Sequence, residues 1–199
     1  MGLVEDEIDD LIYLARTGDN AELTGFLQEL TAREDTTPAK ILTWARGDNL
    51  STCLHMAAAN GHAKTVALLL SHFPPPSKTS IGEAATVASE ASVETEKPYI
   101  NLENAFGNTA LHWACLGGHL DIVKLLLSRG ASPTAENEKE QIPLDLAASN
   151  NHMHIVEFFL SQSKDIEGEN AQEGGLEKAA QNVQVEGGEE EKSEAAGQS

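Results

Sequence analysis

A stretch in the middle of this chain recurs further along it at a fixed offset. The stretch covers residues 104–133, and its equivalents follow at a spacing of 33 residues. The equivalent pairs are Leu111 and Leu144, His112 and Asp145, Ala114 and Ala147, His119 and His152, and Val123 and Val156. Upstream, residues 51–70 match the same template, and 11–27 keep its apolar framework without its turn and its histidine. The chain therefore contains four repeats, of which the first and the last are degenerate.

Each repeat has the apolar spacing of two helices joined by a tight turn. In the first repeat, apolar residues from Ile8 to Ala15 follow the i, i+3, i+4, i+7 pattern of one helix face. Gly18 and its equivalents Gly61 and Gly118 end the inner helix, where a residue with positive φ is favoured. A single helical pair cannot bury its apolar face alone, so neighbouring pairs must stack. The repeats predict an all-α solenoid of about four helix-turn-helix units.

The period of 33 residues is that of the ankyrin repeat. Residues 51–62 read STCLHMAAANGH, and residues 107–126 read GNTALHWACLGGHLDIVKLL. The chain thus resembles an ankyrin-repeat protein with a repeat domain at 11–160. Within it, the repeats are expected at 11–36, 48–72, 104–136 and 137–160.

Several segments do not fit the repeat. Residues 1–10 form an acidic segment that leads into the first helix, and 73–98, with three consecutive prolines, indicate a mobile insertion. Residues 161–199 contain ten acidic side chains, three basic ones and no aromatic, which predicts a disordered acidic tail. Between the first two repeats, Thr37 and Pro38 are suited to the N-cap and first position of a short extra helix.

The net charge of −19 lies mostly in the two acidic ends. Phosphate contacts need Lys and Arg, so nucleic acid is not expected as a direct ligand. A basic protein partner is favoured instead, because opposite charges steer the two molecules together. The alternative is that the acidic ends only keep the protein soluble.

The location expected from the sequence is intracellular. No apolar stretch is long enough to cross a membrane, and the acidic residues that follow the start of the chain are unlike a signal peptide. Cys53 and Cys115 agree with this location, because they take template positions of small residues in different repeats and suggest no disulfide framework.

The seven histidines do not form a catalytic or metal-binding pattern. Five of them belong to the repeat template, where structural hydrogen bonds are expected. These are His55 and His112 in the turn motif, and His62, His119 and His152 after the inner helix. His72 and His154 have no ligand-like neighbours, and no phosphate loop, nucleophile elbow or dinucleotide fingerprint occurs. We therefore expect a protein that is not an enzyme, with no catalytic residues, metal or cofactor.

Ligands of ankyrin proteins commonly lie on the concave face, which is formed by the turn tips and the exposed side of the inner helices. The resemblance places the partner-binding residues at the matching positions of three repeats. They are Asp48, Asn49, Ser51, Ala59, Asn60, Ala105, Phe106, Asn108, Leu116, Gly117, Glu138, Lys139, Gln141, Ser149 and Asn150.

Four large side chains are relevant to the make-up of this face. Phe106 and Leu116 stand out, because exposed positions gain nothing from large apolar side chains unless a partner covers them. Phe106 could instead pack on the loop before it. Trp113 is expected in the core, and Trp44 could either cap the extra helix or extend the groove.

The layout of the whole chain resembles the small fungal ankyrin-repeat chaperones that are dedicated to ribosomal protein number three of the small subunit, a basic KH-domain protein. The two strong repeats, the acidic start, the long interruption and the acidic tail carry this resemblance. It implies a monomer that binds the newly made ribosomal protein one to one through its N-terminal segment. Such a chaperone keeps its client soluble and accompanies it from cytoplasm to nucleus for small-subunit assembly. The alternative is an ankyrin adaptor or inhibitor that masks a transcription factor or kinase.

Overall fold

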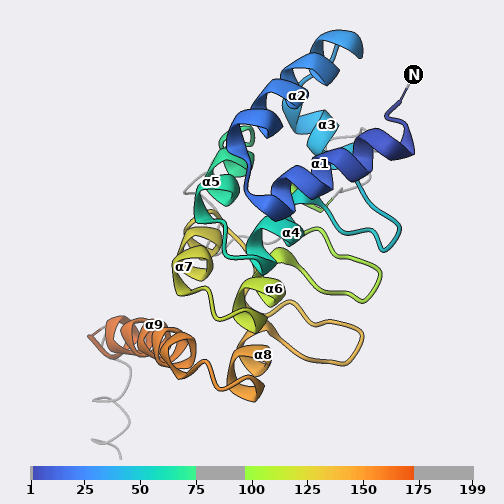
Figure 1. The fold of residues 1–199 in the computed structure, drawn as a ribbon. Coiled ribbons are helices and arrows are strands. Elements are labelled where there is room, and N and C mark those ends of the chain that lie inside the picture. Colours follow the sequence, from blue (N-terminus) through green and yellow to red (C-terminus); the bar gives the residue numbers. More distant parts are fainter. Residues whose placement is uncertain (1, 75–96, 173–199) are drawn as a thin grey trace, which may run out of the picture. The chain divides into compact units, whose positions relative to one another are not determined.

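The computed structural model describes residues 2–74 and 97–172, and every regular element in these ranges is helical (Figure 1). The elements are α1 (Glu5–Thr17), α2 (Asn20–Arg33), α3 (Pro38–Trp44), α4 (Cys53–Ala59), α5 (Ala63–Ser71), the 3-10 helix η1 (Tyr99–Asn101), α6 (Ala110–Leu116), α7 (Leu120–Ser128), α8 (Pro143–Ser149) and α9 (Met153–Gln172). None of these helices combines the length and the apolar character needed to span a bilayer. The chain divides into two compact parts, Met1–Phe159 and Leu160–Ser199, and the packing described below concerns the first.

Four helical pairs stack in the order of the sequence. The inner helices α1, α4, α6 and α8 each pack on the next, and the outer helices α2, α5 and α7 pack in succession beside them (Figure 1). The fourth pair consists of α8 and the first residues of α9. Leu11, Leu54 and Leu111 hold the same place in three inner helices, and each is 0% exposed. The prediction of an all-α solenoid of four helix-turn-helix repeats is confirmed.

The turn between inner and outer helix needs a left-handed backbone in every repeat. Gly18, Gly61 and Gly118 have φ values of 77°, 79° and 75°, as their sequence positions predict. In the fourth repeat Asn151 takes this place with φ 60°, a conformation that asparagine tolerates better than most residues. A Cβ atom on Gly61 would lie 2.8 Å from the ring of His119, so space as well as φ requires glycine there.

The extra helix predicted between the first two repeats is present as α3. The side chain of Thr37 accepts a hydrogen bond from the backbone N–H of Lys40, and Pro38 lies in the first turn. Helix α3 packs on α2 and buries Ile41 and Leu42 completely. It therefore extends the hydrophobic core beyond the residues of the repeats themselves.

The first and last helices extend beyond residues 11–160, the range expected for the repeat domain. Helix α1 begins at Glu5, so the acidic segment 1–10 is mostly helical, because carboxylates in the first turn interact favourably with the helix N-terminus. Helix α9 continues to Gln172, into the tail predicted to be disordered, because extending a helix costs far less than starting one. Residues 75–96 of the predicted insertion and 173–199 of the predicted tail lie outside the described residues.

The two cysteines are part of the core. Cys53 and Cys115 are buried and carry free thiols. Burial raises the pKa of each thiol to about 12. Both thiols therefore stay protonated at neutral pH and act as small apolar side chains.

Candidate partner-binding site

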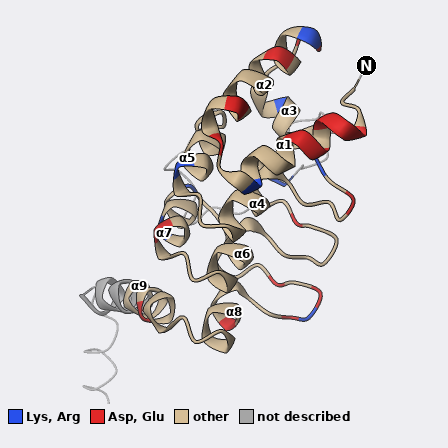
Figure 2. Ribbon diagram, in the orientation of Figure 1, with Lys and Arg blue, Asp and Glu red and all other residues tan. Residues whose placement is uncertain are grey.

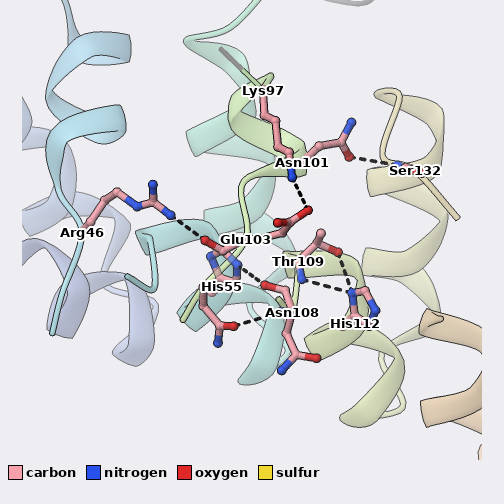
Figure 3. Close-up of polar contacts among 10 residues, drawn as sticks. Arg46, His55, Lys97, Asn101, Glu103, Asn108, Thr109, His112 and Ser132 are labelled. Carbon is pink, nitrogen blue, oxygen red and sulfur yellow. Dashed lines mark hydrogen bonds and ion pairs between the residues drawn. The ribbon is translucent and has the colours of Figure 1, made fainter. Parts of the chain in front are cut away.

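In the second and third repeats, a buried threonine caps the start of the inner helix and a buried histidine lies three residues further on. Figure 3 shows Thr109 and His112 of the third repeat and His55 of the second. In the third repeat, the backbone N–H of Thr109 donates to Nδ1 of His112 over 3.1 Å, and Nε2 of His112 donates to the carbonyl of Gln141 over 3.0 Å. In the second repeat, Nε2 of His55 donates to the carbonyl of Asn108 over 2.9 Å. Each histidine thus links its own inner helix to the loop that begins the next repeat.

Burial keeps these two imidazoles neutral. It lowers the pKa of His55 from 6.5 to about 4, and it also lowers the pKa of His112. A neutral imidazole has one acceptor and one donor nitrogen, which is the pattern that the accepting Nδ1 and the donating Nε2 require. Both side chains are therefore committed to structural hydrogen bonds.

A second set of histidines joins the turn of one repeat to the end of the inner helix in the repeat before it. The imidazole Nε2 atoms lie within hydrogen-bond distance of backbone carbonyls. The pairs are His62 with Arg16 at 2.8 Å, His119 with Ala59 at 3.2 Å, and His152 with Leu116 at 3.0 Å. The structural hydrogen bonds predicted for the five repeat histidines are thus confirmed. His154, for which none was predicted, lies 3.1 Å from the carbonyl of Gly118.

No metal site is evident in the part of the chain that the structure describes. Within residues 2–74 and 97–172, no group of three or more His, Cys, Asp or Glu side chains could hold a metal ion.

The loops that precede the inner helices lie side by side. The backbone N–H of Ala105 donates to the carbonyl of Asn49 over 2.7 Å, and that of Glu138 donates to the carbonyl of Phe106 over 3.1 Å. These bonds join the loop of the second repeat to that of the third, and the third to the fourth. The loop tips consequently form a continuous edge beside the inner helices (Figure 1).

A hollow of about 260 Å³, termed the groove hollow, lies between the loop tips and the inner helices of the third and fourth repeats. Its apolar walls are Phe106, Trp113, Leu116 and Leu146. Its polar lining consists of Asn108, His112, Asn137, Glu138, Lys139 and Gln141. An apolar hollow with a few polar groups is suited to an anchoring side chain of a partner protein.

The structure brings six of the residues predicted to bind a partner together in the groove hollow. They are Phe106, Asn108, Leu116, Glu138, Lys139 and Gln141. Eight others lie outside it and are exposed or half-buried. They are Asp48, Asn49, Ala59, Asn60, Ala105, Gly117, Ser149 and Asn150.

Ser51 requires a correction, because it is 1% exposed and its side chain is not available to a partner. Its loop closes tightly, with the backbone N–H of Gly47 donating to the carbonyl of Ser51 over 3.1 Å. The hydroxyl of Ser51 is buried and has no hydrogen-bond partner in the structure. The surface of the second repeat is therefore smaller than predicted.

Four of the ten lining residues, His112, Trp113, Asn137 and Leu146, are not among the predicted partner-binding residues, and Trp113 is the largest of them. It was expected in the core, but it is half-buried and lines the groove hollow, and its indole Nε1 has no hydrogen-bond partner in the structure. Repeat spacing contains the signal that identifies it. Tyr13, Met56, Trp113 and Leu146 take the same position in the four inner helices, and none of them is fully buried.

Phe106 and Trp44 are both exposed, and only one of them belongs to the groove hollow. Phe106 is 56% exposed and lines the hollow, so it is not buried against its own loop. Trp44 ends α3 with 46% of its surface exposed, and it is not among the lining residues. Phe106 is therefore the aromatic side chain that a ligand in the hollow would meet from the loop side.

Stacked helical pairs with an apolar hollow beside their loop tips define a protein-binding solenoid. The family model for three copies of the ankyrin repeat matches residues 88–172, and the model for a single ankyrin repeat matches residues 49–79. Together with the yeast relative described next, these matches show that the chain belongs to the ankyrin-repeat family.

A yeast relative matches most of the chain. Ankyrin repeat-containing protein YAR1 of Saccharomyces cerevisiae is 33% identical over 184 residues, which cover 92% of this chain and 82% of the yeast protein. The crystal structure of the yeast ribosomal protein Rps3 in complex with its chaperone Yar1 contains a chain that matches with a TM-score of 0.62 and 29% identity. The match covers 80% of this chain and 95% of that chain.

Other relatives share only a repeat region. The chain is 39% identical over 103 and 95 residues to the E3 ubiquitin-protein ligases XBAT32 and XBAT33 of Arabidopsis thaliana. It spans 20% and 18% of the lengths of these ligases. The similarity to the two ligases is therefore limited to about half of this chain, whereas the similarity to the yeast protein covers 92% of it.

Proposed function

We propose that this protein is a dedicated chaperone of the small-subunit ribosomal protein Rps3, with which it forms a one-to-one complex. The observation that carries the proposal is the similarity to yeast YAR1 over 92% of this chain and 82% of the yeast protein. A match of that extent includes the segments between and beside the repeats, which a shared ankyrin fold alone does not require. In the similar crystal structure, the chaperone Yar1 is in complex with Rps3, and we take Rps3 to be the client of this protein as well.

The charge of the chain suits a client that binds RNA. Ribosomal proteins contact RNA phosphates through Lys and Arg side chains, so such a protein exposes a basic surface when it is free. This chain has a net charge of −19 and an isoelectric point of about 4.6. An acidic chaperone attracts that surface at long range, accelerates association and shields it until RNA is available.

The N-terminal segment of the client binds in the groove hollow as a helix. Phe106, Trp113 and Leu116 offer it an apolar wall, and the exposure of Phe106 supports this assignment because a large apolar side chain gains from being covered. The exposed residues Asn49 and Asn60 extend the contact toward the second repeat. The client segment thus runs along the inner helices.

Binding of this kind keeps the newly made client soluble while it is carried from cytoplasm to nucleus for small-subunit assembly. The protein acts by binding alone and catalyses no reaction. Its buried histidines are occupied by structural hydrogen bonds, which supports a role without proton transfer.

Affinity capture from cells tests this proposal. The tagged full-length protein is expressed at its native level, and the captured proteins are quantified by mass spectrometry after ribonuclease treatment. We expect Rps3 in near-equimolar amount and in large excess over other small-subunit proteins, because a chaperone binds the free client. Capture of a stoichiometric transcription factor or kinase in place of Rps3 would support the adaptor alternative and overturn the proposal.

A further inference from the structure

The first helical pair has a face that no other described helix covers. Helix α4 packs between α1 and α6, and α6 packs between α4 and α8, whereas α1 has an inner helix on one side only (Figure 1). A hollow of about 340 Å³ is lined by Asp10, Tyr13, Leu14, Glu22 and Phe26. All five residues belong to α1 and α2, so the hollow lies on the uncovered side of the pair. These five residues are termed the end face.

The centre of the end face is apolar. Tyr13 is 62% exposed, the largest exposed fraction among the exposed large apolar side chains of the described residues. A second hollow shares Tyr13, Leu14 and Glu22 and extends to Asp19 at the turn. The terminal repeat of a solenoid normally presents a polar outer face, so an aromatic ring exposed there favours a partner that covers it.

Two carboxylates that form no ion pair with the described residues, those of Asp10 and Glu22, line the hollow together with this ring. Residues 5–33 contain eight acidic side chains and two basic ones, and acidic positions are prominent on α1 and α2 in Figure 2. The basic residues are Arg33, which forms ion pairs with two glutamates, and Arg16, which lines neither hollow. Among the described residues, Asp10 and Glu22 form no ion pair. The end face therefore carries unbalanced negative charge.

We propose that the end face is a second docking surface, which binds a lysine- or arginine-bearing segment of the same client. The inference rests on the proposed function, since it takes the client to be the basic ribosomal protein. A cationic side chain above the ring of Tyr13 gains cation–π attraction, and its charge compensates Asp10 and Glu22. A second copy of this chain does not fit, because two end faces of the same charge repel each other.

Two separated contacts on one client strengthen each other. Once the client's N-terminal segment occupies the groove hollow, its basic segment meets the end face at a high effective concentration. A weak, salt-sensitive contact at the end face can then raise the affinity of the complex measurably. The contact at the end face also covers part of the client's basic surface, which would otherwise bind RNA.

Titration calorimetry with purified full-length Rps3 tests the end face. The triple variant Asp10→Asn, Tyr13→Ser, Glu22→Gln of the full-length protein removes the ring and both charges. We expect its Kd to be about tenfold weaker than that of the wild type in dilute salt, as one cation–π contact and exposed ion pairs would give. The difference should shrink at high salt, because exposed charges are then screened.

Two control variants keep the test specific. Tyr13→Phe retains the ring and is expected to bind as the wild type does. The double variant Asp121→Asn, Glu157→Gln removes two exposed carboxylates from α7 and α9 and is expected to leave the Kd nearly unchanged. Thermal melting of every variant reports folding.

Each outcome of the titration decides one point. If the folded triple variant binds as tightly as the wild type, or if the double variant is weakened equally, the second docking surface is overturned and the proposed function stands. If the wild type itself does not bind Rps3, the proposed function falls first.

Discussion

Replacing Phe106 and Leu116 together by alanine is expected to weaken the binding of Rps3 about a hundredfold, as the loss of two anchoring contacts would give. Both side chains wall the groove hollow, where an apolar side chain of the client would lose its packing. The melting temperature is expected to change little, because Phe106 is 56% exposed and Leu116 is not part of the buried core. Titration calorimetry measures the affinity, and circular dichroism measures the melting.

A matched control comes from another exposed apolar side chain. Met153 is 54% exposed and does not line the groove hollow, so Met153→Ala should bind Rps3 like the wild type. If the groove variant keeps its affinity, the client segment lies elsewhere on the protein. If Met153→Ala loses as much affinity as the groove variant, the effect is not specific to the hollow.

The largest loss of folding stability is expected from His55→Ala, with a cost of about 3 kcal/mol or more. His55 is 1% exposed, accepts hydrogen bonds from Thr52 and donates to the carbonyl of Asn108. Alanine would leave these buried groups without partners and would also create a cavity. Because His55 links two adjacent repeats, the loss should appear in the unfolding of the whole stack. Urea denaturation followed by circular dichroism measures the free energy of unfolding.

The variant His154→Ala is the control, because it removes an exposed imidazole in place of a buried one. His154 is exposed and makes one hydrogen bond, of 3.1 Å, to the carbonyl of Gly118. Its replacement is expected to cost about 0.5 kcal/mol or less, as is usual for surface substitutions. Equal losses for the two variants would show that the buried links between repeats do not dominate the stability.

The stacking of the repeats could be predicted because each repeat places the same residue types at the same spacing. Positions one period apart lie next to each other in a solenoid. Gly61 and His119 therefore contact one another although the sequence separates them widely. Helix α3 was predictable for a local reason, since Thr37 and Pro38 define the start of a helix wherever it packs.

The exposure of single side chains could not be read from the same spacing. Ser51 and Asn108 are equivalent in the template, but Ser51 is 1% exposed, whereas Asn108 lines the groove hollow. Trp113 and its equivalent Met56 are both half-buried, but only the larger Trp113 lines the groove hollow. These differences depend on the size of neighbouring side chains, which a repeat template does not specify.

The behaviour of free Rps3 in solution tests the central claim most directly. Purified Rps3 is mixed with increasing amounts of this protein, its aggregation is followed by light scattering, and the soluble fraction is analysed by size exclusion with mass determination. A dedicated chaperone predicts that one equivalent keeps Rps3 in solution as a one-to-one complex, and that the affinity falls as salt rises. Aggregation of Rps3 that an excess of this protein does not reduce would contradict the account.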